Sequence, residues 1–372
     1  MVVKPVVQWK NLLLKIAGLI LFFPFSIVVK FFLHIRNFLY DHEWMHVTRI
    51  GTPIICVGSV TAGGSGKTPV VEFLAAKLSR EGCRVAVVSN GYRKKSTGTI
   101  LVSDGKTIAA SVESSGDEAY LLARNFIKNN LDIPVVSGAD RIAAVQYLET
   151  SFRSEVIILD DGYQYRKLHS DWNIVILDYH EWLYPHWAIP LGRLRDLARR
   201  IDDADAILVS KCPEQVDPKP WEIFQPKKIF SSYPISSFVN YHTNASISLG
   251  SIAGRSVLAF AGLGFHESFC RSLQKICGDY QAVLKDFIEF QDHHWYQPRE
   301  IKRIIDKAKR DRAVVVTTEK DAVKLKKEWM TQQVDAWIAI PKIKFLDDTF
   351  EIWATSISRH LQKTQTADMV SA

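Results

Sequence analysis

The residues with the clearest capacity for chemistry lie in the stretch VGSVTAGGSGKTPVVEFLA, residues 57–75. A glycine-rich turn that enters a helix presents backbone N–H groups to an anion, and the ending Gly-Lys-Thr is typical of a phosphate-binding loop. In such a loop Lys67 reaches the β- and γ-phosphates, and the Thr68 hydroxyl ligates Mg²⁺. The alternative, a glycine turn before a core helix, leaves Gly-Lys-Thr unexplained. We therefore predict a nucleotide site formed by Thr61, Ala62, Gly63, Gly64, Ser65, Gly66, Lys67 and Thr68.

Thr61 stands where the usual pattern G-x-x-x-x-G-K-[ST] has its first glycine. Glycine is needed only where the backbone must adopt a positive φ. The phosphate site is therefore compatible with Thr61 on one condition, which is that this position does not require a positive φ.

A pair of carboxylates, Asp160 and Asp161, follows the apolar run of residues 156–159. Carboxylates at the carboxyl end of a strand in an α/β sheet can hold Mg²⁺ directly or through water. The alternative is a strand end with two solvated aspartates. Because a phosphate-binding loop is predicted nearby, we favour the metal interpretation for Asp160, Asp161 and Thr68.

The absence of a guanine-binding motif indicates which base the nucleotide carries. A guanine site normally shows [NT]-K-x-D after a later strand, but Ser210-Lys211 is followed by Pro213 where the aspartate should be. The stretch TTEKDAV, residues 317–323, has the letters in a different order. ATP is therefore preferred, with Mg²⁺ as its metal.

Further polar groups follow predicted strands and would emerge at the same sheet edge. Asp117 and Glu118 begin the helical stretch in SGDEAYLLA, where an acid is also stabilising without any function. His293 lies in FQDHHWY, and an Asp-His pair in a loop can orient a hydroxyl or a catalytic carboxylate. The remaining candidates are Arg93, Arg141 and Arg195.

Strand and helix patterns alternate along the chain. Residues 53–58 read as a short buried strand, and Pro69–Gly82 has helical spacing that ends at a glycine. The fold class predicted is α/β, with a doubly wound, mostly parallel sheet of the P-loop type and a smaller C-terminal α/β lobe. The predicted parts are residues 1–45 (membrane-associated segment), 46–225 (P-loop domain), 226–250 (linker strands), 251–350 (C-terminal lobe) and 351–372 (tail helix and frayed end).

Residues 12–35 form the most apolar segment. Its longest uncharged stretch, residues 16–29, is shorter than the roughly 20 residues of a bilayer span and contains Pro24. An interfacial helix is favoured, while a thin span and a soluble core helix stay open. The chain carries a net charge of +7, and residues 1–50 hold six basic and two acidic side chains. This placement favours an anionic membrane surface over nucleic acid. The five cysteines include no C-x-x-C pair, which indicates neither a zinc site nor a disulfide framework.

Taken in order, these motifs resemble those of the tetraacyldisaccharide 4'-kinase family, the lipid A 4'-kinases of Gram-negative bacteria. In that family threonine commonly opens the phosphate loop, as Thr61 does here. The matching stretches run from about residue 54 to residue 326, and they are VGSVTAGGSGKTP, GYRKK, GDEA, GADR, ILDDGYQYRKLHSD, LAFAGLGFHESF, FQDHHWY and TTEKDAVKL.

The resemblance implies transfer of a phosphoryl group from ATP to the 4'-hydroxyl of a tetraacylated glucosamine disaccharide 1-phosphate, at the cytoplasmic face of the inner membrane. It implies a lipid-linked acceptor and no obligate protein partner. By the same resemblance Asp117 is the general base and His293 pairs with it, Asp160 and Asp161 serve Mg²⁺, and Gln164 is functional. Basic candidates for the acceptor's 1-phosphate or for ATP are Arg93, Lys94, Arg141 and Arg195.

The sequence departs from the family pattern at four places: Asn90, Ala119, Tyr165 and the pair Arg195-Asp196. These departures concern acceptor contacts and leave the phosphate site intact. Two other functions stay open, namely a membrane-associated P-loop NTPase switch without a lipid acceptor and a nucleotide-binding scaffold without catalysis.

Overall fold

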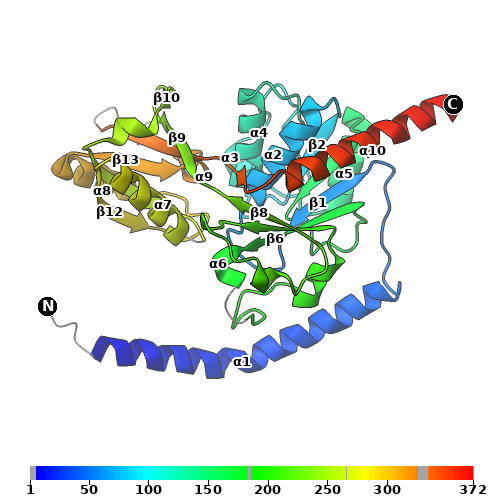
Figure 1. The fold of residues 1–372 in the computed structure, drawn as a ribbon, viewed down its shortest axis with the longest axis horizontal. Coiled ribbons are helices and arrows are strands. Elements are labelled where there is room, and N and C mark those ends of the chain that lie inside the picture. Colours follow the sequence, from blue (N-terminus) through cyan, green and yellow to red (C-terminus); the bar gives the residue numbers. More distant parts are fainter. Residues whose placement is uncertain (1–5, 183–185, 265, 326–333, 372) are drawn as a thin grey trace.

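The computed structural model describes residues 6–182, 186–264, 266–325 and 334–371, and of residues 6–20 and 365–371 it describes only the helical backbone. Two sheets organise these residues into two lobes (Figure 1). The first lobe lies on the right of Figure 1 and the second on the left, with the long helix α1 (Val6–Asp41) along the lower edge.

In the described part of the chain, nine strands form the first sheet in the order β15-β8-β7-β6-β1-β5-β2-β4-β3. Neighbours from β8 to β4 run parallel, and the two edge strands, β3 and β15, are antiparallel. The strands are β1 (Ile54–Gly58), β2 (Val85–Ser89), β3 (Ile100–Ser103), β4 (Val135–Ser137), β5 (Val156–Asp160), β6 (Trp172–Asp178), β7 (Ala206–Ser210), β8 (Lys227–Ser232) and β15 (Lys344–Phe345).

Helices cover both faces of this sheet, so its central strands are buried along their whole length. Every residue of β1 and β5 is buried, which explains their continuous apolar sequences. The helices of this lobe are α2 (Lys67–Arg80), α3 (Val112–Ser115), α4 (Asp117–Lys128), α5 (Arg141–Phe152), α6 (Tyr179–Trp182) and α10 (Thr349–Ser371), with short 3₁₀ turns at Ala198–Asp203 and Lys219–Trp221.

The second sheet has the order β10-β9-β14-β13-β11-β12. Its inner strands are parallel, and β9 and β10 add an antiparallel edge. Its elements are β9 (Ile235–Asn240), β10 (Ser246–Ile247), a 3₁₀ turn (Leu249–Ile252), β11 (Ser256–Ala261), α7 (His266–Asp279), β12 (Val283–Glu289), α8 (Pro298–Asp311), β13 (Ala313–Thr318), α9 (Glu319–Ala322) and β14 (Ala336–Pro341).

A two-stranded ribbon joins the lobes. Pro341 pairs with Ile235 at the end of the second sheet, and Lys344 pairs with Ser232 at the edge of the first. Beyond the ribbon, α10 returns to the first lobe, where its apolar side chains share a core with α2. The predicted α/β class with a mostly parallel sheet and a smaller second lobe is therefore confirmed. The predicted domain limits stay predictions, and β8, which falls inside the predicted linker, pairs with β7.

Helix α1 has an inverted polarity where its side chains are described. Its buried side chains between residues 21 and 41 are Ser26, Asn37 and Tyr40. Its exposed side chains include Leu21, Phe22, Phe23, Phe25, Ile27, Val28, Phe31, Phe32, Ile35 and Phe38. By length and composition alone, Leu21–Asp41 is the one helix in the described residues that qualifies as a membrane span.

Candidate active site

The glycine-rich loop connects the end of β1 to the start of α2. Gly63 and Gly66 have φ values of 118° and 88°, which glycine adopts without strain. Thr61 has no positive φ, so the condition set by the sequence for replacing the first glycine is met. Instead, the Thr61 N–H donates to the Ser59 hydroxyl at 3.2 Å. The loop therefore has its left-handed turns where the glycines are.

Residues 186–196, which we call the strap, lie against the first half of this loop. The Ala62 N–H donates to the Arg193 carbonyl at 2.7 Å, and Nε of Arg193 donates to the Ala62 carbonyl at 2.9 Å. Thr61 also forms a bridge with Leu194. The strap thus fixes the mouth of the loop and engages the Ala62 N–H, one of the groups predicted to bind phosphate.

The carboxylate of Asp161 contacts two basic side chains beside the glycine-rich loop. Arg195 donates two hydrogen bonds to its carboxylate, at 3.0 and 2.7 Å, and Nζ of Lys67 lies 3.6 Å away. Burial alone raises the pKa of Asp161, but the charges of Lys67 and Arg195 outweigh it and lower that pKa to about 2. Asp161 is therefore ionised, and it holds Lys67 at the start of α2.

Asp160, at the end of β5, has the opposite environment. It is 1% exposed, and neither of its carboxylate oxygens has a hydrogen-bond partner among the described residues. Burial, together with the charges of Glu118 and Asp161, raises the pKa of Asp160 to about 8. A buried carboxylate without a partner is unfavourable unless a bound cation or a proton neutralises its charge.

The residues present fit a Mg²⁺ ion that is bound together with the phosphates of a nucleotide. Mg²⁺ is commonly bound by one or two carboxylates together with substrate phosphates and waters. Accordingly, the described residues contain no cluster of three His, Cys, Asp or Glu side chains that could hold a metal alone. Asp160 offers free oxygens and Thr68 lies at the start of α2, whereas Asp161 is already engaged by Arg195.

A second group of charges forms where the two lobes meet. Asp117 begins α4 in the first lobe, and His293 lies in the loop after β12 in the second. Nδ1 of His293 is 3.0 Å from each carboxylate oxygen of Asp117. Both residues are buried, at 5% and 8% exposure. His293 has a left-handed φ of 59°, so a strained loop residue is retained at this contact.

Two lysines of the second lobe complete this group. Nζ of Lys320 lies 3.1 Å from Nε2 of His293, and Nζ of Lys324 lies 3.6 Å from the Asp117 carboxylate. Because an ammonium group only donates, Nε2 accepts from Lys320 and Nδ1–H donates to Asp117. Burial would raise the pKa of Asp117, but the bond from His293 and the charge of Lys320 lower it to about 2. Lys320 also pairs with Glu118 at 3.3 Å.

The Asp117–His293 pair and the phosphate loop belong to one region. Gly264 lies between them, since a Cβ built on it would be 3.4 Å from the Gly64 nitrogen and 3.1 Å from an Asp292 carboxylate oxygen. The loop of the second lobe therefore reaches the phosphate loop of the first. Residues that are hundreds of positions apart in the chain form a single site.

The remaining predicted residues have mainly structural contacts here. Arg93 donates to the Asp292 carbonyl at 2.8 Å, which is another bond between the lobes. Arg141 donates to the Asn90 side chain at 2.9 Å and to the Asp161 carbonyl at 3.2 Å. The remaining candidate, Gln164, donates to the carbonyl of Ser59 at 2.6 Å, just before the phosphate loop.

Sequence reasoning missed Lys320, Lys324 and Lys211. Lys320 and Lys324 lie in TTEKDAVKL, a stretch that belongs to the family resemblance but whose pattern assigns no role to its lysines. Lys211, at the end of β7, donates to the Gly64 carbonyl at 2.5 Å and pairs with Asp178 at 2.7 Å. The only sequence pattern that marks Lys211 is the Ser210-Lys211 pair after an apolar strand.

A cavity of about 380 Å³ adjoins the phosphate loop. Its wall includes Thr61 and the polar ends of β6 and β7, Asp178 and Lys211. The second lobe contributes residues of α7, namely Glu267, Ser268 and Arg271. The cavity therefore lies between the lobes, next to the loop that is predicted to hold phosphate.

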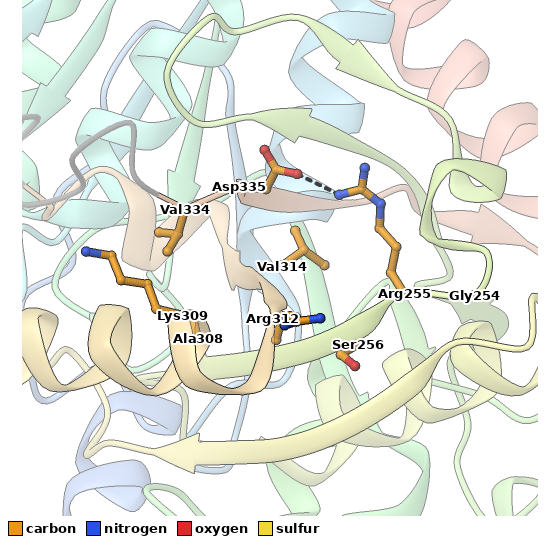
Figure 2. A pocket seen from close by; sticks show the side chains of 10 residues that line it. Gly254, Arg255, Ser256, Ala308, Lys309, Arg312, Val314, Val334 and Asp335 are labelled. Atoms are coloured by element: carbon orange, nitrogen blue, oxygen red, sulfur yellow. Dashed lines mark hydrogen bonds and ion pairs between the residues drawn. The ribbon is translucent and has the colours of Figure 1, made fainter.

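A larger cavity of about 580 Å³ lies elsewhere, at the beginnings of β11, β13 and β14 (Figure 2). Arg255 and Asp335 form an ion pair of 2.6 Å across it. Ligand sites in open α/β sheets occur at the carboxyl ends of strands, and none of the predicted site residues lines this cavity. It is therefore not the active site.

Comparisons with known proteins show the family to which this chain belongs. The family model described as tetraacyldisaccharide-1-P 4'-kinase matches residues 19–359. The chain is 34% identical over 318 residues to the tetraacyldisaccharide 4'-kinase of Porphyromonas gingivalis strain W83, covering 81% of this chain and 85% of that protein. The corresponding protein of Aquifex aeolicus is 32% identical over 302 residues, covering 81% and 88%. The chain belongs to the tetraacyldisaccharide 4'-kinase family.

A solved structure extends the similarity to the whole fold. It is described as an apo form of LpxK from Aquifex aeolicus in complex with ATP. With a TM-score of 0.70 and 29% identity, it covers 91% of this chain and 98% of its own.

The departures from the family pattern have local explanations in this structure. Asn90 accepts a hydrogen bond from Arg141, while Tyr165 donates to Asp140 at 3.1 Å. Ala119 is fully buried in α4, where it packs in the core of the first lobe. Asp196 is also fully buried, and its carboxylate accepts hydrogen bonds from Arg36 and Asn37 of α1.

Proposed function

We propose that this chain phosphorylates the 4'-hydroxyl of a tetraacylated glucosamine disaccharide 1-phosphate with ATP, and so makes lipid IVA in lipid A biosynthesis. The observation that carries the proposal is the buried Asp117–His293 contact at 3.0 Å, formed between the lobes beside a phosphate loop. Family membership supports the same reaction. The site supplies what phosphoryl transfer needs, which is charge neutralisation and a positioned base.

Asp117 is proposed as the general base. It is ionised, and its neighbour His293 fixes the direction of its carboxylate. As the acceptor's 4'-oxygen attacks the γ-phosphorus of ATP, Asp117 takes the hydroxyl proton and ADP leaves with the electrons of the broken P–O bond. No covalent enzyme intermediate is required. Lys67 lies at the start of α2, where its charge would neutralise the γ-phosphoryl group of bound ATP.

Asp160 and Thr68 are proposed to hold Mg²⁺ with the nucleotide phosphates. When bound, the ion supplies neutralisation of the negative charge that builds on the phosphoryl oxygens. Asp160 has both carboxylate oxygens available for this. Asp161 supports the site by holding Lys67 and Arg195 in place.

The cavity of about 380 Å³ is proposed to take the nucleoside part of ATP. It begins at Thr61, beside the phosphate loop, and continues along the ends of β6 and β7. Lys211 links this cavity to the loop through the Gly64 carbonyl. An ATP molecule in this position contacts both lobes, because α7 forms the opposite wall.

Helix α1 is proposed to place the enzyme on the anionic cytoplasmic face of the inner membrane, where the acceptor's acyl chains remain. The support is its inverted polarity, with Phe31 and Phe32 at 60% and 63% exposure while Ser26 and Asn37 are buried. A contiguous exposed apolar surface of this kind is typical of a membrane or protein contact. Lys30 lies on the same helix, as expected next to anionic lipid.

The test uses lipid vesicles that carry the 4'-dephosphorylated disaccharide, incubated with ATP labelled in its γ-phosphate. We expect label to enter the lipid fraction. An NTPase switch releases labelled inorganic phosphate and leaves the lipid unlabelled, and a scaffold binds ATP without releasing label. Either of these results from folded, ATP-binding protein contradicts the proposal.

A further inference from the structure

The buried polar residue Asn37 connects α1 to the strap. Nδ2 of Asn37 donates to Oδ1 of Asp196 at 2.8 Å, and Nη2 of Arg36 donates to Oδ2 of Asp196 at 2.7 Å. Asn37 and Asp196 are both 0% exposed. A buried carboxylate is costly unless each oxygen is paired, and α1 supplies a partner for each oxygen.

Further contacts hold the same end of α1 to the first lobe. Asp41 pairs with Arg166 at 2.8 Å and with Arg199 at 3.5 Å. Arg166 also donates to the Asn37 carbonyl at 3.3 Å. These contacts join the C-terminal turns of the helix to two separate segments of the lobe. A flexible tether would need none of them.

Arg195, the residue that precedes Asp196 in the strap, contacts the predicted nucleotide site directly. It forms the two hydrogen bonds to Asp161 described above, and it donates to the Ser59 carbonyl at 3.2 Å, immediately before the phosphate loop. Asp196 in turn accepts the Leu197 N–H at 2.8 Å, which fixes the backbone on its other side. The path from α1 to the loop therefore has three residues: Asn37, Asp196 and Arg195.

A second contact ties α1 to the other end of the strap. The Ser26 hydroxyl donates to the Ala188 carbonyl at 2.6 Å, and the rings of Phe23 and Trp187 meet edge to face with centroids 5.5 Å apart. Between these two anchors the strap forms its bridge to Thr61. Each end of the strap is therefore held by a buried polar residue of α1.

We propose that Asn37 and Arg36 are positioning residues of the kinase reaction, which hold the strap through Asp196 so that Arg195 orients Asp161 and the start of the phosphate loop. The inference rests on the proposed function. It makes the apolar helix a structural part of the nucleotide site rather than only a membrane contact. Removing the Asn37 side chain leaves the apolar surface of α1 unchanged and loosens the loop that carries Lys67.

The test compares Asn37→Ala with His34→Ala, which removes an exposed polar side chain one turn earlier in α1. Both full-length variants are assayed with vesicles of phosphatidylethanolamine and phosphatidylglycerol that contain the acceptor. We expect Asn37→Ala to lower kcat about tenfold or more, because displacements near 1 Å of catalytic groups have effects of up to a hundredfold. Its KM for the acceptor and its co-sedimentation with vesicles remain as in the wild type, and His34→Ala retains wild-type kcat.

A rescue experiment separates positioning from general damage. Asn37→Asp alone places two buried carboxylates together and should lower kcat further. Combining it with Asp196→Asn restores one amide and one carboxylate, with the carboxylate now at position 37 and the amide at position 196. We expect this double variant to recover at least a third of wild-type kcat. Arg36→Gln changes a side chain that is 32% exposed, so the fold should tolerate this substitution better than one at a buried position. We expect Arg36→Gln to lower kcat severalfold.

Three results would overturn the inference. One is an unchanged kcat in folded Asn37→Ala or Arg36→Gln, and another is an equal loss in His34→Ala. The third is a loss confined to vesicle binding, with kcat intact at saturating lipid. If the wild type itself transfers no label to lipid, it is the proposed function that fails, so the two failures are distinguishable.

Discussion

Nδ1 of His293 lies 3.0 Å from both carboxylate oxygens of Asp117, although 176 positions of the chain separate the two residues. One residue comes from the P-loop lobe and the other from the second lobe. The contact therefore depends on how the lobes meet. Lys320, at 3.1 Å from the other ring nitrogen, holds the imidazole from the second lobe's side.

The first prediction concerns Asp117, the proposed general base, and its neighbour His293. Asp117→Ala should lower kcat by about 10²–10⁴, the usual contribution of a general base. His293→Ala should lower kcat by about tenfold or more, because the carboxylate loses the partner that directs it. His294→Ala is the matched control, since His294 bonds to Glu300 at 2.9 Å within its own lobe. Steady-state kinetics that give equal, mild losses for all three variants contradict these assignments.

The second prediction concerns pH. Lys320 is one of the charges that lower the pKa of Asp117 to about 2, so Lys320→Met should raise that pKa toward its ordinary value near 4. A base acts only when ionised, and the acidic limb of the kcat/KM profile should therefore move to higher pH by up to about one unit. Lys302→Met, at an exposed position on α8, is the control.

The same shift has a consequence for stability. Because the folded-state pKa of Asp117 is depressed, its contribution to stability is present above pH 4 and is lost as the pH falls toward 2. Lys320→Met should reduce this contribution. An acidic limb and an acid-unfolding midpoint that both match the Lys302→Met control would show that Lys320 does not act on Asp117.

The parts of the site that local patterns predict are those built from one strand, turn and helix. The phosphate loop, the Asp160-Asp161 pair at the end of β5 and the helix start at Asp117 are of this kind. Strand periodicity and glycine spacing determine them without reference to the rest of the chain. The resemblance to a family then supplied the pairing of Asp117 with His293.

The contacts that local patterns did not predict arise from docking between distant segments. The positions of Lys320 and Lys324 beside Asp117 depend on the lobe interface, and that of Asn37 beside Asp196 depends on how α1 crosses the strap. No periodicity marks a buried asparagine in an apolar helix as a partner for an aspartate 159 positions away. Such contacts require the three-dimensional arrangement.

The third prediction concerns the membrane. Phe31 and Phe32 are exposed and meet edge to face on α1. Replacing both with serine should reduce co-sedimentation with anionic vesicles at least tenfold, because each exposed aromatic side chain contributes about 1.5–3 kcal/mol when buried in an apolar environment. The melting temperature should stay within about two degrees, since neither ring is in the protein core. A large loss of thermal stability with intact vesicle binding contradicts the membrane assignment.

The last prediction separates catalysis from stability at Asp160. Burial raises the folded-state pKa of Asp160 from 3.8 to about 8, so between these pH values the folded protein binds a proton that the unfolded chain does not. Stability without metal or nucleotide should therefore fall as the pH rises through this window. Asp160→Asn replaces a buried group that can ionise with a neutral amide. It should therefore stabilise the ligand-free protein by about 1–3 kcal/mol at pH 8. The same variant should lose kinase activity by a hundredfold or more.

Urea unfolding of the ligand-free protein at pH 5 and pH 8 measures this effect directly. The advantage of Asp160→Asn over the wild type should be small at pH 5 and should grow toward pH 8, because only the wild type gains a buried charge. Asp306→Asn, at an exposed position on α8, should show no such trend. An advantage that is absent at pH 8, or the same at both pH values, would mean that Asp160 is not held in a desolvated environment that a cation completes.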